Sequence, residues 1–196
     1  IVKLGTVPIL VGHSMGGLIV QKYLESCDAP AGILLASVPH TGLMFSFMRM
    51  MYRYPNVCQK ICLMNMLPRN MWEYETSFQE MRDLFFSKSV RPDKLKEYFP
   101  YFQRESPRVI WEMSWIDYLP RYWKVKTPLL VLGAEQDVFV PPDLVRSTAA
   151  AYNTQAYIFP DMGHAMMLDK DWQDVADRMI DWLEKGMQNQ TENSNI

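Results

Sequence analysis

A serine bracketed by glycines, placed between an apolar run and a segment of helical period, constrains this chain more than any other feature. The run Val7–Val11 leads into the hexapeptide GHSMGG at positions 12–17, and apolar residues at helical spacing continue to Tyr23. A short apolar run, a glycine-rich turn and a helical period together predict a strand, a sharp turn and a helix. Because the two backbones pass close to each other at such a turn, we expect lack of space to require Gly12 and Gly16.

The predicted turn gives Ser14 the surroundings of a nucleophile. A strained turn between strand and helix exposes a serine hydroxyl above the end of a sheet. The helix that follows directs its backbone N–H groups toward the place where negative charge would develop during a reaction. The alternative is a glycine-rich turn without chemistry. The flanking strand and helix signals, and two partner residues later in the chain, favour the chemical interpretation.

Three further apolar runs follow, at 33–38, 128–133 and 155–159, each short and bounded by turn residues. Runs of this kind are typical of strands buried in a parallel sheet. A helix is predicted at 141–152, opened by prolines, and another at 171–185, whose apolar residues follow one helix face. Alternating strands and helices predict an α/β fold with a parallel sheet.

The end of the chain changes character after the last predicted helix. Gly186 is placed to close that helix, as glycine often does at a helix C-terminus. Residues 188–196 are polar, and we expect a disordered tail there.

The interval from Pro39 to Lys126 is far longer than a normal connection between strands of one sheet. It carries helical signals of its own, a capping-box pattern at Ser77–Glu80 and a helix start at Ser106–Pro107. We therefore expect a mostly helical cap, inserted over the sheet edge that bears Ser14. The predicted organisation is a core at 1–38, a cap at 39–127, a second core segment at 128–187 and a tail at 188–196.

The cap interval is rich in aromatic, methionine and basic residues. It holds 18 of the 25 aromatic residues, 9 of the 15 Met, and 14 of the 20 Lys and Arg, but only 9 of the 22 Asp and Glu. One interpretation is an adaptable apolar pocket beneath a basic outer face, suited to acyl chains, anionic head groups or a lipid surface. The alternative is that a small helical subdomain uses these residues for its own core and carries solvated charges outside. Composition leaves both open.

A serine nucleophile needs a base to take its proton, and only three histidines are present. His164 follows the last predicted strand in a loop, and we expect it to be the general base and acid. His13 adjoins Ser14, so the turn directs its side chain elsewhere, and it is expected to line or support the site. His40 follows the second predicted strand and could reach the substrate pocket, although packing at the start of the cap is the alternative.

The base in turn needs an orienting carboxylate. The loop 133–141 leaves the C-terminal end of the third predicted strand, where parallel sheets gather functional groups. Asp137 lies in the middle of this loop and is our candidate. The acids that we weighed against it are Glu135, Asp143 and Asp161.

The order Ser14, Asp137, His164, together with the elbow, resembles the α/β-hydrolase superfamily. The GHSMGG form is similar to that of monoacylglycerol-lipase-like and lysophospholipase-like members, and the resemblance extends over residues 7–185. It implies Ser14 as nucleophile, Asp137 as orienting acid, His164 as base and the backbone N–H of Met15 as one oxyanion donor. In that superfamily about four strands precede the elbow, and a second oxyanion donor follows one of them.

The expected activity is hydrolysis of carboxylic esters, including lipid or lysophospholipid esters, through an acyl-enzyme. A prolyl-type aminopeptidase, a thioesterase, an acyltransferase and a catalytically silent fragment with the same fold remain alternatives. The mechanism implies no metal or organic cofactor. The expected partner is a small-molecule or lipid ester, without nucleic acid, and the basic cap suggests peripheral membrane contact. Nothing in the sequence indicates an oligomeric state.

The chain begins at Ile1, a few residues before the predicted elbow strand, so we expect a C-terminal fragment of a longer protein. Its three cysteines are too few for a disulfide framework, which favours a reducing, cytoplasmic location. Cys58 and Cys62 lie four positions apart without a histidine or carboxylate at ligand spacing, so we interpret them as packing residues.

Overall fold

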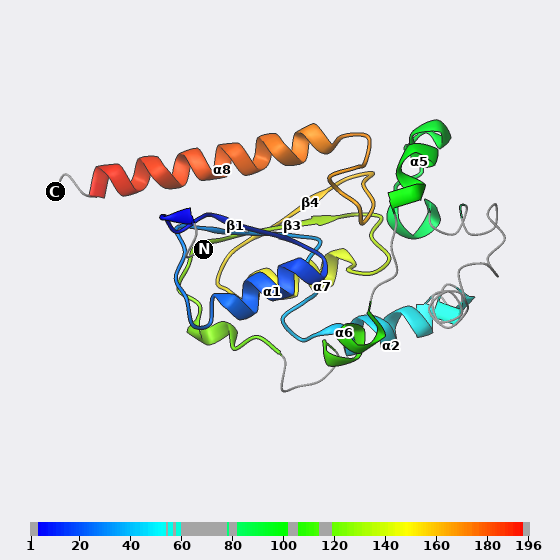
Figure 1. Cartoon of the computed structure of the whole chain (residues 1–196), viewed down its shortest axis with the longest axis horizontal. Coiled ribbons are helices and arrows are strands. Elements are labelled where there is room, and N and C mark those ends of the chain that lie inside the picture. Colours follow the sequence, from blue (N-terminus) through cyan, green and yellow to red (C-terminus); the bar gives the residue numbers. More distant parts are fainter. Residues whose placement is uncertain are drawn as a thin grey trace.

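Four parallel strands in sequential order form the sheet at the centre of the molecule (Figure 1). The computed structural model describes residues 4–53, 55–56, 58–59, 78, 82–101, 106–113 and 119–193. The strands are β1 (Leu10–His13), β2 (Gly32–Leu35), β3 (Leu129–Ala134) and β4 (Ala156–Phe159). The side chains of β2 and β3 are fully buried, as their continuous apolar sequences predict.

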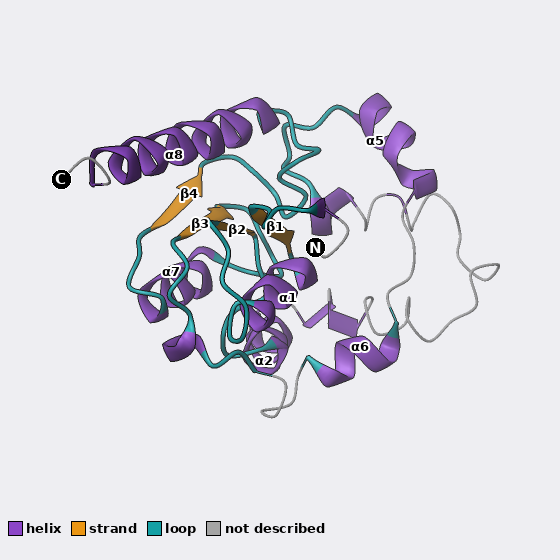
Figure 2. Ribbon diagram, turned by 60° about the vertical axis from the view of Figure 1, so that its left-hand side comes forward, coloured by secondary structure: helices purple, strands orange, loops and turns teal. Residues whose placement is uncertain are grey.

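Helices cover both faces of the sheet (Figures 1 and 2). Helix α1 (Met15–Tyr23) connects β1 to β2, and helix α7 (Pro142–Ala151) connects β3 to β4. Both lie on one face of the sheet, and helix α8 (Trp172–Asn193) lies on the other. This is the layered arrangement that alternating strands and helices predict.

The apolar residues of the strands divide between two cores with the period of two that a strand imposes. On β2, Ile33 and Leu35 pack in the cluster that includes Val175 of α8. Leu34, between them, packs with Val20 of α1, with Leu24 directly after that helix, and with residues of α7. Helices thus cover the central strands β2 and β3 on both faces of the sheet.

Some of the described helices between β2 and β3 lie on the side of the sheet that α1 covers, farther from the sheet than α1. The others lie past the C-terminal ends of the strands (Figures 1 and 2). The described helices of this interval are α2 (Leu43–Arg53), α5 (Pro92–Tyr98) and α6 (Pro107–Glu112), with 3-10 turns η3 (Phe99–Tyr101) and η5 (Tyr122–Lys124). The helix expected from Ser106–Pro107 is therefore confirmed as α6. Of the capping-box pattern at 77–80, only Phe78 lies within the described residues.

Two segments of this interval are tied directly to the core. The backbone N–H of Ala165, next to His164, donates to the carbonyl of Phe85 at 2.7 Å. At the other end of the interval, Lys22 of α1 donates to the carbonyl of Leu119 at 3.2 Å. Cys58 is buried, as expected of a packing residue, and Cys62 lies outside the described residues.

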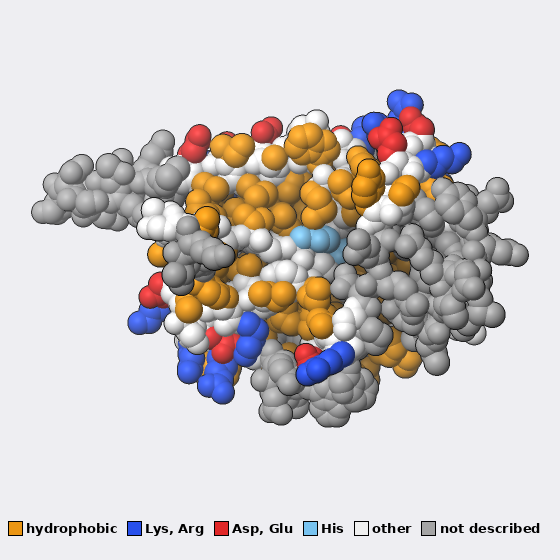
Figure 3. Space-filling model, viewed as in Figure 1, with side chains coloured by type: hydrophobic (Ala, Val, Ile, Leu, Met, Phe, Trp, Pro, Cys, Tyr) orange, Lys and Arg blue, Asp and Glu red, His pale blue; other side chains and the backbone are white. Residues whose placement is uncertain are grey.

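Strand β1 starts later than its apolar run predicts. The run begins at Val7, yet Val7 and Ile9 are exposed and pairing with β2 starts at Leu10. Pairing then continues through His13, up to the turn itself. Val11 of this edge strand is also exposed, and hydrophobic side chains gather on the face of the molecule that Figure 3 shows.

The end of α8 differs from the sequence expectation. The helix does not stop at Gly186 and continues to Asn193, so most of the predicted tail at 188–196 is helical. Gly186 does not adopt the positive φ of a glycine that ends a helix. A single interior glycine costs only about 1 kcal/mol relative to alanine, and the Met and Gln residues that follow favour a helix.

Candidate functional site

Ser14 occupies a strained backbone position that its neighbours hold from several sides. Its φ is 52° and its ψ is −117°, a conformation that residues with a side chain rarely adopt. The N–H of Ser14 donates to the carbonyl of Leu35 at 3.0 Å. Its carbonyl accepts the N–H groups of Gly17 at 3.1 Å and Val38 at 3.0 Å. These bonds to the end of β2 and the start of α1 compensate the strain and fix the origin of the side chain.

The glycines around Ser14 are needed at positions 12 and 17 rather than at 12 and 16. A Cβ atom on Gly12 would overlap the backbone of Gly16 and Gly17, which confirms the expectation for Gly12. A Cβ atom on Gly17 would overlap the side chain of Ser37. A Cβ atom on Gly16 would meet nothing within 4 Å, so the expectation for Gly16 is wrong. At Gly16 it is the backbone that approaches Gly12, and the Cβ direction is open.

The structure brings the side chains of Ser14, His164 and Asp137 together. His164 Nε2 lies 3.0 Å from Ser14 Oγ, and His164 Nδ1 lies 2.7 Å from Asp137 Oδ2. A carboxylate can only accept hydrogen bonds, so the proton of the neutral imidazole is on Nδ1. Nε2 is then free to accept the serine hydroxyl proton. These residues lie 150 and 27 positions apart in sequence, and only the fold makes them neighbours.

Asp137 is held by its own loop, which leaves β3 and enters α7. Its Oδ1 accepts the backbone N–H groups of Phe139 at 2.8 Å and Val140 at 2.9 Å. Its side chain has no exposed surface, and that of His164 is only 3% exposed. The loop therefore fixes one carboxylate oxygen and leaves the other for the imidazole.

The rings around His164 shield it from water. The ring centroid of Phe139 lies 5.0 Å from that of His164, and the centroid of Phe85 lies 6.0 Å away. The ring of His13 lies 4.8 Å away on a further side. Phe85 belongs to the long interval between β2 and β3, so this interval contributes directly to the surroundings of the imidazole.

His13 supports the loop of His164 instead of facing Ser14. Its Nε2 lies 2.9 Å from the carbonyl oxygen of His164, and because a carbonyl only accepts, Nε2 carries the proton. Burial, and then the nearby His164, lower the pKa of His13 to about 4. His13 is therefore neutral at pH 7 and places no positive charge beside His164.

His40 has no contact with the other candidate residues among those that the structure describes. Its ring packs edge-on against Tyr122, with the centroids 5.3 Å apart. Its buried Nδ1 has no hydrogen-bond partner in the described part of the chain, and burial lowers its pKa. These surroundings match the packing alternative, at the point where the chain leaves β2.

The backbone N–H of Met15 is available to a ligand. Met15 begins α1 directly after Ser14, and its N–H has no acceptor among the described residues. The first N–H groups of a helix have no partner within it, and the positive end of the helix dipole adds to their attraction for an anion.

Asp169 is a buried residue of this region that the sequence did not reveal. It is 2% exposed, and its Oδ2 accepts the N–H groups of Gly163 and Ser87, each at 2.9 Å. Its Oδ1 accepts the hydroxyl of Ser87 and the N–H of Lys170, each at 2.7 Å. Asp169 thus ties the loop of His164 to a segment 82 positions earlier. The one available signal was an acid at the end of an otherwise apolar stretch after His164.

A buried glutamine fixes the helix behind the serine. Gln21 of α1 is fully buried and donates to Ser37 Oγ at 2.8 Å and to the carbonyl of Val38 at 2.9 Å. Its oxygen accepts the hydroxyl of Tyr152 at 3.0 Å. The amide therefore connects α1 both to the chain after β2, which binds Ser14, and to the end of α7.

The described part of the chain contains neither a metal-binding group of side chains nor a membrane-spanning helix. No group of three or more His, Cys, Asp or Glu side chains is placed to hold a metal ion there. No helix there is long and apolar enough to cross a membrane.

A sequential parallel sheet, with a serine on the strained turn between its first strand and first helix, defines the α/β-hydrolase architecture. Residues 2–178 match the Alpha/beta hydrolase family, and the chain belongs to that family. The predicted fold class and family resemblance are thereby confirmed. No curated protein matches the chain in sequence.

Solved structures with the same fold are similar over nearly the whole chain. Rv0554 from Mycobacterium tuberculosis superposes with a TM-score of 0.67 at 20% identity, over 93% of this chain and 68% of that one. A monoacylglycerol lipase from Paleococcus ferrophilus gives 0.62 at 20% identity, over 94% and 70%. A thermophilic esterase from Thermogutta terrifontis gives 0.63 at 18% identity, over 94% and 67%. At these identities the likeness concerns the fold alone.

Proposed function

We propose that this chain carries the catalytic residues of a serine hydrolase that cleaves carboxylic esters. The observation that carries the proposal is the pair of short contacts at His164, 3.0 Å to Ser14 Oγ and 2.7 Å to Asp137 Oδ2. A hydroxyl, an imidazole and a carboxylate in this order make up the arrangement that activates a serine nucleophile. Family membership supports the same reaction class.

In the proposed mechanism, Ser14 Oγ attacks the ester carbonyl while His164 Nε2 takes its proton. Asp137 holds the imidazole in the required tautomer and stabilises the imidazolium that forms. The N–H of Met15 donates to the oxyanion of the tetrahedral intermediate. His164 then protonates the leaving alcohol, and the same imidazole activates the water that releases the acid from Ser14.

We propose a lipid or other apolar ester as the substrate. Helix α2 presents an exposed apolar side to which Met44, Met48, Met51 and Tyr52 contribute. Unbranched methionine side chains adapt to acyl chains of different shape. Related folds include a monoacylglycerol lipase and esterases. In this proposal the interval between β2 and β3 acts as a cap over the site, with peripheral contact to a lipid surface through α2 and its basic residues. His13 borders the substrate pocket, and His40 packs where the chain leaves β2.

Labelling with a fluorophosphonate tests the nucleophile. We expect one covalent adduct on Ser14, located by peptide mass spectrometry and absent in Ser14→Ala. Ser37, which lies nearby but bonds to Val38 and Gln21, is the matched control, and Ser37→Ala should still be labelled. A folded protein that never forms the Ser14 adduct would contradict the proposal.

A substrate panel then separates esterase activity from the alternatives. Acyl esters of increasing chain length, a thioester and aminoacyl amides of proline should be compared at equal concentration. We expect kcat/KM to be highest for the oxygen esters and to rise with acyl length up to the limit of the apolar pocket. Preference for the aminoacyl amides would instead indicate a peptidase.

A further inference from the structure

His13 connects the elbow to the loop that carries the proposed base. It is the last residue of β1, where it pairs with Leu35 of β2, so the sheet fixes its backbone. Its Nε2–H donates to the carbonyl oxygen of His164 at 2.9 Å, and the centroids of the two rings lie 4.8 Å apart. His13 therefore joins two parts of the chain that are 151 positions apart in sequence.

This contact is one of two hydrogen bonds that join the elbow, residues 12–17, to the loop 160–169 in the described part of the chain. The other is the bond between Ser14 Oγ and His164 Nε2 at 3.0 Å. The carbonyl of His164 also accepts the N–H of Met166, but that bond lies within the loop and fixes nothing relative to the elbow. The hydrogen bonds that tie this loop to segments other than the elbow involve Phe85, Ser87, Glu135, Gln136 and Asp137.

The bond between Ser14 and His164 does not last through the proposed reaction. Once an acyl group is attached to Ser14 Oγ, that oxygen carries no proton, and its hydrogen bond to Nε2 is lost. Water then adds to the acyl carbon while Nε2 takes its proton, and the proton passes to Ser14 Oγ as the ester bond breaks. The bond from His13 uses the backbone carbonyl of His164 and stays intact. In the acyl-enzyme it is therefore the one hydrogen bond between described residues that still joins the elbow to this loop.

The donor on His13 is neutral, which suits its place beside the imidazole. Burial, and then the neighbouring His164, lower the pKa of His13 to about 4, so His13 carries no charge at pH 7. The imidazolium that forms on His164 in each half of the reaction would be destabilised by a second positive charge on a ring 4.8 Å away. Histidine thus supplies an N–H donor without the charge that a lysine or arginine would bring.

We propose that His13 is a positioning residue that holds the imidazole of His164 over the acylated Ser14 while the acid is released. The inference rests on the proposed function and adds to it a residue that acts through His164. A catalytic group displaced by about 1 Å can cost roughly 10²-fold in rate, so the loss of one hydrogen bond that fixes its position has a measurable effect.

Two substitutions separate the donor of His13 from its ring. His13→Gln keeps an N–H donor at a similar reach without the ring, whereas His13→Phe keeps a ring without a donor. With a p-nitrophenyl ester we expect His13→Phe to lower kcat by about 10- to 100-fold and to release a burst of p-nitrophenol, because release of the acid becomes slower than acylation. His13→Gln should keep most of the kcat of the parent chain. His40→Phe is the matched control and should keep the kcat of the parent, since the ring of His40 packs against Tyr122 and not against His164.

The position of the imidazole can also be measured without a reaction. Ser14→Ala removes the hydroxyl bond, as acylation does, and leaves the bond from His13. In crystal structures we expect His164 to keep its place in Ser14→Ala and in Ser14→Ala with His13→Gln, and to be displaced in Ser14→Ala with His13→Phe.

Three outcomes would overturn the proposal. They are a His13→Phe chain with the kcat of the parent, a His13→Gln chain that loses as much kcat as His13→Phe, and an imidazole in the same place in all three crystal structures. A parent chain that forms no Ser14 adduct and cleaves no ester would instead refute the proposed function. The crystal structures would then still decide whether His13 positions His164.

Discussion

The buried carboxylate of Asp169 accepts both the backbone N–H and the hydroxyl of Ser87. It also holds the N–H of Gly163, the residue before His164. The backbone at 86–87 passes so close to Gly163 that a Cβ atom there would overlap it. The position of the imidazole thus depends on a segment of the long interval between β2 and β3, and one carboxylate provides the connection.

We predict that Asp169→Asn lowers both the free energy of unfolding and kcat. The amide keeps one accepting oxygen, so buried donors lose their partner at a cost of about 2–4 kcal/mol. Urea unfolding measures the first effect, and ester hydrolysis by the folded variant measures the second. The exposed Asp171→Asn, two positions away, should change neither. If Asp169→Asn keeps the kcat and KM of the parent, Asp169 does not position His164.

Alanine should have opposite effects at two glycines of the elbow. Gly12→Ala places a Cβ atom against the backbone of Gly16 and should destabilise the protein by about 1–3 kcal/mol or prevent folding. Gly16→Ala lies in the first turn of α1 with open space before it, and should be neutral or stabilising by up to about 1 kcal/mol. Chemical denaturation of both variants decides the matter, and equal destabilisation would show that the turn needs both glycines.

The strands could be predicted because the information that marks each of them is local. Each buried strand is a short apolar run, and Leu34 between Ile33 and Leu35 needed no distant contact to be recognised as part of one. The ends of elements were harder to predict. Gly186 signals a stop, but a helix end also depends on the conformation that the glycine adopts, and here Gly186 keeps a conformation compatible with the helix.

Replacement of Asp137 by Asn should lower kcat by roughly 10³- to 10⁴-fold, because the amide no longer enforces the Nδ1–H tautomer of His164. Glu135 and Asp161, the other acids near this loop, give matched controls. Both are exposed, and their recorded hydrogen bonds are to each other and to Gln136 and not to the imidazole, so Glu135→Gln and Asp161→Asn should retain nearly full kcat. Steady-state hydrolysis of a short ester measures all three. A larger loss of kcat in either control variant than in Asp137→Asn would mean that the orienting acid is misassigned.

His13 makes stability depend on pH. Its pKa is about 4 in the folded chain, below its usual value of about 6.5, so the unfolded chain binds more protons between these values. The contribution of His13 is therefore complete above pH 6.5 and is lost as the pH falls toward 4. Between pH 7.5 and 5 we expect a loss of about 2 kcal/mol from this group. His13→Gln, compared with the parent chain by urea unfolding at each pH, should show a correspondingly smaller decrease. Identical pH dependence in both chains would contradict the prediction.

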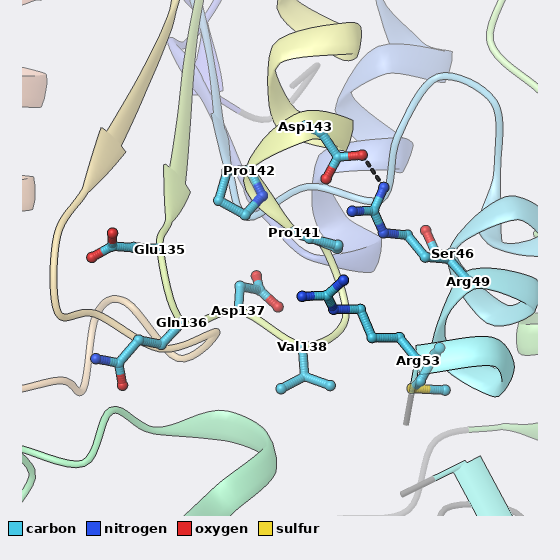
Figure 4. Close-up of a pocket in the computed structure, with 11 residues that line it drawn as sticks. Ser46, Arg49, Arg53, Glu135, Gln136, Asp137, Val138, Pro141, Pro142 and Asp143 are labelled. Carbon is cyan, nitrogen blue, oxygen red and sulfur yellow. Dashed lines mark hydrogen bonds and ion pairs between the residues drawn. The ribbon is translucent and has the colours of Figure 1, made fainter. Parts of the chain in front are cut away.

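Three residues of the candidate site could be predicted because each lies at a position that the sequence pattern marks. Ser14 lies in a distinctive turn, and Asp137 and His164 follow buried strands at the end where functional loops gather. Asp169 and Gln21 could not be found in this way. Their role is to form hydrogen bonds with backbone groups distant in the sequence, such as the N–H of Ser87. No local sequence pattern marks a residue for that role. A cavity of about 270 Å³ between α2 and the loop of Asp137 likewise exists only because these two segments, far apart in the sequence, face each other (Figure 4).

The backbone angles of Ser14 have a consequence for how this sequence could change over generations. A residue with a side chain at φ 52° and ψ −117° raises the energy of every folded molecule, whether or not a substrate ever arrives. Glycine would occupy the same place with less strain and leave the strand and helix undisturbed. A lineage released from any demand except folding should therefore replace the hydroxyl early, at the very position where the chemistry would begin.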